Sequence, residues 1–287
     1  MATSELPSFD LVVATIGRVV ELEGLLRSLE VQSHARFRVL VVDQNADGRL
    51  DPAITAHPVL ELVHLHSDKG LSRARNRALA ELAADVIAFP DDDCIYPDDL
   101  LARVASRLDE RPELDGIAGR IVGTDGGSSP SWKQDTALLT PANLWNRAAS
   151  GALFLRRGVL ATVGEFDEQL GLGSGTAWDS GEETDYVVRA VRSGAHIEYD
   201  PEIVVLHDEK PLTRPALRTR GFREGASVGY ILRKNRYSAR IVLRMLVRPA
   251  FGTVVSLLRL DRPGATFHAA TLRGRVVGYR GARAYSR

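Results

Sequence analysis

The sequence predicts an α/β protein, a doubly wound and mostly parallel sheet flanked by helices, with a basic helical extension. Short apolar runs alternate with helical stripes in the order β-α-β-β-α-β over the first ninety or so residues, the pattern of strands joined by right-handed crossovers. The run at 86–89 is apolar throughout, as in parallel strands covered on both faces. A change of charge near residue 210 separates a domain at 1–210 from a tail at 211–287.

Each element has its own signal. Leu22, Leu25, Leu26 and Leu29 follow the first strand at the spacing of one helix face. Ser72 can cap a helix that runs to about Ala83, and further helices are expected after 97, 157 and 182. A loop rich in glycine and serine is expected at 124–134, and it should be mobile. Strands are expected at 9–15, 37–43, 60–65, 86–89, 116–123, 151–155, 196–199 and 203–207.

Composition narrows the class of protein. The 287 residues are 44% hydrophobic and 26% charged, as in a globular chain with one large domain and an appendage. Cys94 is the single cysteine, so no intramolecular disulfide can form and a reducing compartment such as the cytoplasm is expected. Residues 1–8 lack the pattern of a signal peptide, and no uncharged apolar stretch reaches 18 residues, so we expect no membrane-spanning segment.

The zero net charge conceals a strong asymmetry. Residues 1–210 contain 20 Lys+Arg and 35 Asp+Glu, whereas residues 211–287 contain 17 Lys+Arg and two acids. In the tail we expect a basic helix at 217–234 and a second helix at 238–260, broken near Pro249. Arginines lie along one edge of the second helix's wide apolar surface, which favours a helix lying in an anionic membrane interface. Packing on the domain or in a homodimer is the alternative. Aromatic residues are too few to favour nucleic acid.

Three carboxylates, Asp91, Asp92 and Asp93, end the apolar strand at 86–89. Adjacent acids repel one another unless a cation or hydrogen-bond donors compensate. Ligands of open α/β sheets bind at the carboxyl ends of strands, and oxygen ligands suit Mg²⁺ or Mn²⁺ bound to a substrate's phosphates. The pattern therefore favours a metal–phosphate site over a solvated acidic turn.

Other polar residues fall at the same edge. Asp43 ends the second strand, where an acid can accept hydrogen bonds from a ribose or base, although it also begins a segment of turn-forming residues. Lys69 precedes a glycine turn and a helix start, which favours phosphate. His207 ends an apolar run and is either a metal ligand or a strand-end histidine.

An acidic helix start follows a glycine-rich segment. Residues 171–178 have the composition of a loop that closes over a ligand, or of a plain flexible loop, and they include Trp178. Ser180 and Glu183 match a capping box, which by itself would explain both residues. Glu182 and Asp185 suit the helix dipole, so catalysis is one of two readings of this segment.

Together these segments resemble the family 2 glycosyltransferases of the GT-A fold, over about 9–207. The resemblance rests on Val12–Arg18, Val41–Asp43, Gly70–Asn76, Phe89–Asp93 and Gly181–Asp185. It implies an inverting transfer from a nucleotide-diphosphate sugar, with Mn²⁺ or Mg²⁺. We therefore expect nucleotide contacts at Thr15, Arg18, Asp43, Lys69, Arg73 and Asp91; metal ligands among Asp91, Asp92, Asp93 and His207; and acceptor-side positions at Trp178 and Gly181.

The chain departs from the family at the catalytic base. The family's acid pair usually reads Glu-Asp, whereas this chain has Glu182 and Glu183, so the base stays open between Glu183, Glu182 and Asp185. The tail and the family point to a lipid-linked or polysaccharide acceptor and a peripheral place on the inner face of the cell membrane. A sugar nucleotidyltransferase is disfavoured because residues 14–18 lack its glycine-rich basic loop. A non-catalytic nucleotide-sugar-binding or scaffold protein is disfavoured by the intact acids.

Overall fold

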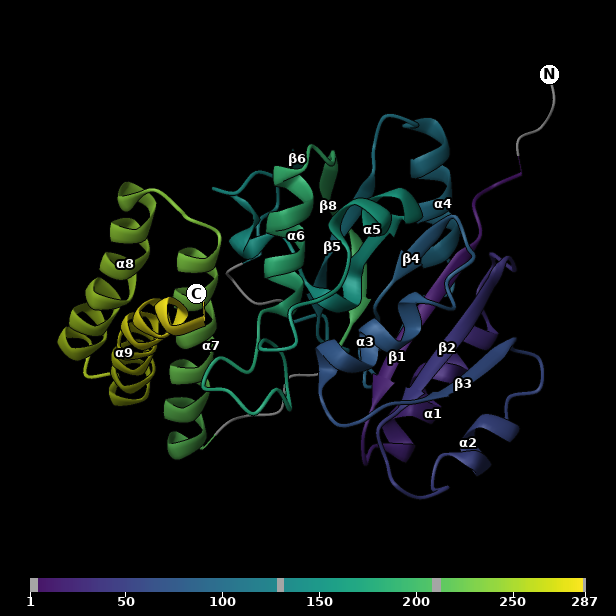
Figure 1. Cartoon of the computed structure of the whole chain (residues 1–287), viewed down its shortest axis with the longest axis horizontal. Helices are drawn as coiled ribbons and strands as arrows, with labels where there is room; N and C mark the ends of the chain where they lie inside the picture. The colour runs from purple at the N-terminus through teal and green to yellow at the C-terminus, as the bar shows by residue number, and fades with distance from the viewer. Residues whose placement is uncertain (1–4, 128–131, 208–212, 286–287) are drawn as a thin grey trace. The chain divides into compact units, whose positions relative to one another are not determined.

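The computed structural model describes residues 5–127, 132–207 and 213–285 (Figure 1). Contacts divide the chain into a sheet unit, residues 1–166 with 186–209, and a helical unit, residues 167–185 with 210–287. The expected boundary at 210 lies outside the described residues, as does part of the expected loop at 124–134. The segment 167–185 groups with the tail.

The sheet unit is built on one eight-stranded sheet in the order β3-β2-β1-β4-β7-β5-β8-β6 (Figure 1). Its strands are β1 (Phe9–Thr15), β2 (Phe37–Asp43), β3 (Leu62–His66), β4 (Val86–Ala88), β5 (Gly116–Val122), β6 (Ala137–Leu138), β7 (Leu153–Arg156) and β8 (Ile197–Leu206). β1 pairs in parallel with β2 and β4, β2 with β3, and β5 with β8. β7 runs antiparallel between β4 and β5, and β6 is antiparallel to β8. The predicted mostly parallel sheet is confirmed.

Helices flank this sheet: α1 (Val19–Glu30), α2 (Asp51–Thr55), α3 (Leu71–Leu79), α4 (Leu100–Glu110), α5 (Arg157–Val163) and α6 (Glu182–Arg192), whose first turn belongs to the helical unit. The leucine stripe of α1 is buried in one core with apolar residues of α4, β1 and β2. Each fully buried leucine contributes about 1.5–3 kcal/mol. The period of the stripe therefore predicted the face of α1 that is buried.

Two expected boundaries in the sheet unit were wrong. The strands expected at 196–199 and 203–207 form the single strand β8, which passes Pro201 through a shift of register against β5. A bulge tolerates a proline that a regular ladder does not. Ser72 does not cap α3; the helix begins after Gly70, which adopts φ +140°, and Ser72 is buried inside it.

Asp10 is a buried acid within β1 that nothing in the apolar pattern predicted. Its carboxylate accepts from Arg38 Nε at 2.6 Å and Nη2 at 3.0 Å, and from the amides of Ala83 at 2.7 Å and Ala84 at 3.0 Å. Burial by itself raises the pKa of Asp10, but these donors outweigh it and lower the pKa below the ordinary value. The acid thus fixes the turn before β4, and with it the strand that leads to Asp91.

The helical unit contains α7 (Arg214–Lys234), α8 (Ala239–Leu258) and α9 (Arg262–Tyr285), the last of which was not predicted. Figure 1 shows α7 and α9 side by side. Their contact is made by glycines at four-residue spacing: Gly221, Gly225 and Gly229 on α7, and Gly274 and Gly278 on α9. A Cβ added at Gly221 would lie 2.7 Å from the Phe267 carbonyl oxygen. The two backbones therefore approach more closely than side chains would allow.

The predicted break at Pro249 was wrong, since α8 continues through it. A proline inside a helix leaves the carbonyl four residues earlier without its usual donor. Here that carbonyl belongs to Met245, and it accepts a hydrogen bond from Arg275 of α9. Burial, with the nearby charge of Arg248, lowers the pKa of Arg275 to about 10. A side chain from another helix thus replaces the missing hydrogen bond.

α8 exposes most of its apolar surface within the described chain. Leu243, Val247, Phe251, Val254, Leu257 and Leu258 are each more than half exposed. By length and composition α8 is the one described helix apolar enough to cross a membrane, with a mean hydropathy of 1.7 and 22% of its apolar window buried. That window contains Arg244 and Arg248, in keeping with the absence of a long uncharged stretch.

Candidate active site

The sheet unit gathers polar residues at the carboxyl ends of neighbouring strands. Asp43 ends β2 opposite Thr15 in the register with β1, and Asp91–Asp93 follow the adjacent strand β4. An isolated bridge pairs Ile95 with Leu206 at the end of β8, with backbone hydrogen bonds of 2.8 and 3.0 Å. This bridge places His207 beside the three aspartates.

Arg18 and His207 hold the second and third aspartates. Arg18 Nη1 donates to Asp92 Oδ1 at 2.8 Å and to Asp93 Oδ2 at 2.5 Å. His207 Nε2 lies 3.1 Å from Asp93 Oδ1, the other oxygen of the same carboxylate. The mutual repulsion of the acids is therefore offset by a cation from the β1 loop and an imidazole from the end of β8.

The two carboxyl groups respond to this environment in opposite directions. Burial raises the pKa of Asp92, although Thr15 and Arg18 oppose the shift. Burial also favours the neutral form of Asp93, but His207 and Arg18 outweigh it and lower its pKa. Asp93 is therefore the acid of this pair that is most firmly held as an anion.

The donor set fits a divalent cation. Asp93 Oδ1 and His207 Nε2 are 3.1 Å apart, close to the roughly 3 Å between adjacent ligands at about 2.1 Å in an octahedron. Carboxylate oxygens suit Mg²⁺ and Mn²⁺, and an added imidazole favours Mn²⁺, the transition metal of the two. The Asp91 side chain is 40% exposed, and its Oδ1 lies 3.5 Å from Arg75 Nη2. These residues can hold a metal while Arg18 balances the remaining charge.

Arg75 of α3 is a buried cation close to Asp91. It is 1% exposed, and its guanidinium lies 5.6 Å from the ring centre of Phe89 and 5.5 Å from that of Phe166. Its Nη2 donates to Ser150 Oγ at 2.5 Å and lies 3.5 Å from Asp91 Oδ1. Arg75 thus positions Asp91. Its place one turn into α3 was the one indication of its burial in the sequence.

Asp43 and the loop before α3 form the nucleotide side of the predicted site. Asp43 Oδ1 accepts from the backbone amide and the side-chain amide of Asn45, both at 2.7 Å, which is the turn role that the sequence offered as the alternative. Gly70 N donates to Gln44 Oε1 at 2.7 Å, which ties the loop before α3 to the loop after β2. Lys69 and Arg73, close to Gly70 in the sequence, are both exposed.

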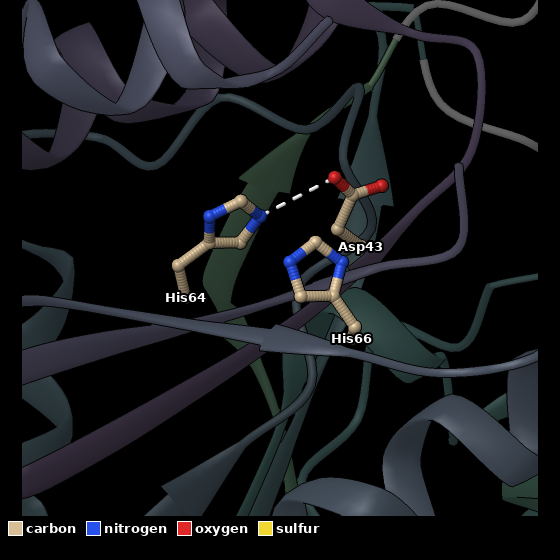
Figure 2. A group of neighbouring side chains, drawn as sticks. All are labelled: Asp43, His64 and His66. Atoms are coloured by element: carbon tan, nitrogen blue, oxygen red, sulfur yellow. Dashed lines mark hydrogen bonds and ion pairs between the residues drawn. The ribbon is translucent and has the colours of Figure 1, made fainter. Parts of the chain in front are cut away.

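Two histidines on β3 were missed by the sequence analysis. His64 Nε2 lies 3.3 Å from Asp43 Oδ2, and His66 is the register partner of Asp43 (Figure 2). The imidazole rings of His64 and His66 are 4.6 Å apart between centres. The signal available was the alternation in Leu62–His66, which places both histidines on one face of the strand.

The predicted catalytic acids open α6 in the helical unit, and their surroundings differ. Asp185 is fully buried, with its oxygens 2.9 Å from Lys234 Nζ and 2.8 Å from Asn235 Nδ2. Glu182 is 4% exposed. Glu183 is only partly buried, and its Oε1 accepts a hydrogen bond from Thr184 at 3.0 Å. Glu183 is therefore the most accessible of the three.

Trp178 and Gly181 have packing roles in the helical unit. Trp178 is 7% exposed and stacks on Tyr230 of α7, with ring centres 5.0 Å apart. Gly181 adopts φ +75°, and a Cβ there would lie 3.1 Å from Ile231 Cδ1. Ser180 Oγ donates to Ser227 Oγ at 2.9 Å, so its hydroxyl serves the contact with α7. The acidic turn is thereby held on α7.

Comparison with curated proteins shows relatives among glycosyltransferases. A pre-mycofactocin glycosyltransferase of Mycobacterium tuberculosis is 28% identical over 227 residues, which are 74% of this chain and 46% of that protein. The succinoglycan biosynthesis protein ExoM of Rhizobium meliloti is 28% identical over 239 residues, 77% of this chain and 74% of that protein. The chain thus spans about half the length of the first of these relatives.

Solved structures share the fold. The mannosyltransferase PcManGT from Pyrobaculum calidifontis, in complex with GDP-Man and Mn²⁺, has a TM-score of 0.64 at 16% identity and covers 96% of this chain and 88% of its own. S. aureus TarS 1–349 in complex with UDP-GlcNAc has a TM-score of 0.60 at 18% identity and covers 93% and 90%. The predicted GT-A architecture is therefore confirmed. The family model for glycosyl transferase family 2 matches residues 10–163, more than half of the 287 residues, and the chain belongs to that family.

Proposed function

We propose that this protein transfers a sugar from a nucleotide-diphosphate sugar to an acceptor hydroxyl, with inversion at the anomeric carbon and with Mn²⁺ or Mg²⁺. The observation that carries the proposal is the arrangement of Asp91, Asp92 and Asp93 at the carboxyl end of β4, with His207 Nε2 3.1 Å from Asp93. Relatives named for glycosyl transfer, and solved homologues complexed with GDP-Man or UDP-GlcNAc, support the donor class.

The donor's nucleotide is assigned to the edge formed by β1, β2 and the loop before α3. Asp43 and Thr15 stand opposite each other there, and Lys69 and Arg73 add exposed positive charge suited to phosphate. Asp91, positioned by Arg75, is assigned to the ribose. Asp93 and His207 would hold the metal, which when bound would neutralise the leaving diphosphate.

Glu183 is assigned as the base. In a single displacement the acceptor oxygen attacks the anomeric carbon while Glu183 takes the hydroxyl proton. The bond from that carbon to the diphosphate oxygen breaks, and its electron pair leaves with the diphosphate. Asp185 is proposed to position the acidic turn instead, because Lys234 and Asn235 already engage both of its oxygens.

The experiment is Glu183→Gln, with Glu182→Gln as the matched variant on the same turn. General-base catalysis is worth roughly 10²–10⁴-fold, so we expect kcat to fall by that factor with donor binding retained. Steady-state transfer and a thermal-shift titration with UDP or GDP plus Mn²⁺ measure the two quantities. Unchanged turnover in Glu183→Gln would remove this residue from the role.

A cavity in the helical unit supports a lipid-linked acceptor. It has a volume of about 1010 Å³ and is lined by residues of α7, of α9 and of the segment before Trp178, three of them arginines: Thr176, Ala177, Pro215, Arg218, Thr219, Phe222, Arg223, Thr266, Ala269, Ala270 and Arg273. A lining that combines apolar side chains with guanidinium groups suits an amphiphile that carries a phosphate. Thr176 and Ala177 line this cavity and directly precede Trp178. We propose that the segment faces the acceptor through these two residues.

We further propose that α8 lies on the anionic inner face of the cell membrane. Helices that lie in a membrane interface combine an apolar surface with a basic one. Here the exposed apolar residues form the first, and the arginines at 240, 244, 248 and 259 form the second. Flotation with phosphatidylglycerol vesicles should carry the protein, and Phe251→Glu with Leu257→Glu should abolish this. Val59→Glu, at an apolar residue 75% exposed on the sheet unit, is the control. Wild-type protein that stays with the soluble fraction at low salt would contradict the proposal.

A further inference from the structure

Asp43, His64 and His66 form a group of potential metal ligands separate from the three aspartates after β4. One ligand atom from each lies within 4.8 Å of the other two (Figure 2). Parallel pairing of β2 with β3 creates the group, because Asp43 is in register with His66 and His64 lies two residues earlier on the same face. Three ligands come from two rigid strands, which fixes their spacing.

The surroundings orient these ligands. Asp43 has a fully buried side chain, and its Oδ1 is occupied by the two donors of Asn45. Its Oδ2 is the oxygen that faces His64 Nε2 at 3.3 Å. On the other side of the His64 ring, Nδ1 lies 3.9 Å from Asp51 Oδ1. This distance is longer than a hydrogen bond, so Asp51 contributes negative charge near the second ring nitrogen rather than a fixed contact.

The donor set differs in chemistry from the proposed catalytic site. One carboxylate with two imidazoles suits Zn²⁺, Co²⁺, Ni²⁺ or Cu²⁺, and affinity rises from Co²⁺ through Ni²⁺ to Cu²⁺ and is lower again for Zn²⁺. The aspartate site is rich in oxygen and suits Mg²⁺ or Mn²⁺. Both histidines retain solvent contact, since His64 is 22% exposed in its side chain and His66 is exposed. A metal ion can therefore reach the two imidazoles without unfolding β3, whereas the Asp43 carboxylate is covered.

We propose that Asp43, His64 and His66 bind a borderline transition metal, with Zn²⁺ as the representative ion, and that this ion competes with the nucleotide. Metal binding follows from the three ligands alone. The competition rests on the proposed function, in which Asp43 contacts the nucleotide: an ion on Asp43 Oδ2 withdraws that oxygen from the donor. Zn²⁺ would then inhibit an enzyme that Mn²⁺ supports.

The direct test uses the full-length protein and Co²⁺, whose visible absorption reports imidazole coordination. Wild-type protein should bind one Co²⁺ per chain at this group, and Zn²⁺ should displace it. His66→Ala and His64→Ala should each weaken the Co²⁺ affinity at least tenfold. His196→Ala, which removes an exposed histidine outside the group, should not change it. Thermal melting without metal confirms that each variant is folded.

A second measurement separates this proposal from the proposed function. With Mn²⁺ saturating, Zn²⁺ should inhibit sugar transfer by the wild type, and His66→Ala should shift the inhibition to at least tenfold higher Zn²⁺. If transfer is never detected but Co²⁺ binding depends on both histidines, the metal site stands and the proposed function fails. If His196→Ala weakens Co²⁺ binding as much as His66→Ala does, or if neither β3 variant changes it, the metal site is overturned.

Discussion

The sheet unit and the helical unit bury their contacts in different ways. In the sheet unit, large side chains of α1 and α4 fill the space against β1 and β2, and a buried acid such as Asp10 is paired with a cation. In the helical unit, α7 and α9 meet through glycines, with backbone against backbone. The sheet unit is stabilised by large buried apolar side chains. The contact between α7 and α9 instead requires that five positions, the glycines, carry no side chain.

Because of this difference, different kinds of substitution should destabilise the two units. A core of leucine and valine tolerates changes that conserve volume, because neighbouring side chains can rearrange. Two backbones in contact cannot rearrange around a new side chain. Adding a side chain at a glycine should therefore destabilise the helical unit most. Removing one partner of a buried pair should destabilise the sheet unit most.

The largest expected effect is that of Gly225→Leu. A Cβ there would meet the backbone of Thr271 in α9, 3.0 Å or closer, so the helix pair has to separate. Overpacking of this kind costs about 3 kcal/mol. Hydrogen exchange should show lost protection in α7 and α9, while the amides of β1 and β2 stay protected.

Gly24→Ala in α1 is the matched control for that substitution. Gly24 is also a helical glycine, but no atom lies within 4 Å of an added Cβ. Alanine in a helix interior is better than glycine by about 0.5–1 kcal/mol, so this variant should be slightly more stable. Equal losses in both variants would contradict the backbone contact between α7 and α9.

A smaller loss, about 2 kcal/mol, is expected for Asp10→Asn in the sheet unit. The substitution leaves Arg38 without its carboxylate and weakens the bonds from Ala83 and Ala84. Urea unfolding of the wild type and of Asp10→Asn at pH 7 measures the free energy of unfolding. Asp47→Asn, at an exposed acid, is the control. A loss no greater than that of the control would refute the role of Asp10.

The same pair of proteins gives a pH test. The pKa of Asp10 is lowered in the folded state, so its stabilisation is present above the ordinary value of 3.8 and is lost as the pH falls through the lower folded value. Wild-type stability should therefore fall toward that of Asp10→Asn at acidic pH. A difference between the two that stays constant down to pH 2 would contradict the assigned pKa shift.

Much of the candidate site could be predicted from sequence because strand ends are visible as apolar runs that stop at an acid. Asp43 and Asp91–Asp93 were identified in this way, and parallel pairing brought them to one edge. Arg75, His64 and His66 were missed because their importance depends on what lies beside them in space. An arginine in a helix looks the same whether it faces water or two phenylalanine rings.

The sequence by itself determined most strands and helices of the sheet unit, the acidic edge and the opposite charges of the body and the tail, since each depends on local periodicity or composition. The tertiary structure decided which cation holds which acid, why α8 continues through Pro249, and how glycines join α7 to α9. These features require contacts between residues far apart in the chain. Such contacts depend on the register and packing of whole elements, which no local pattern encodes.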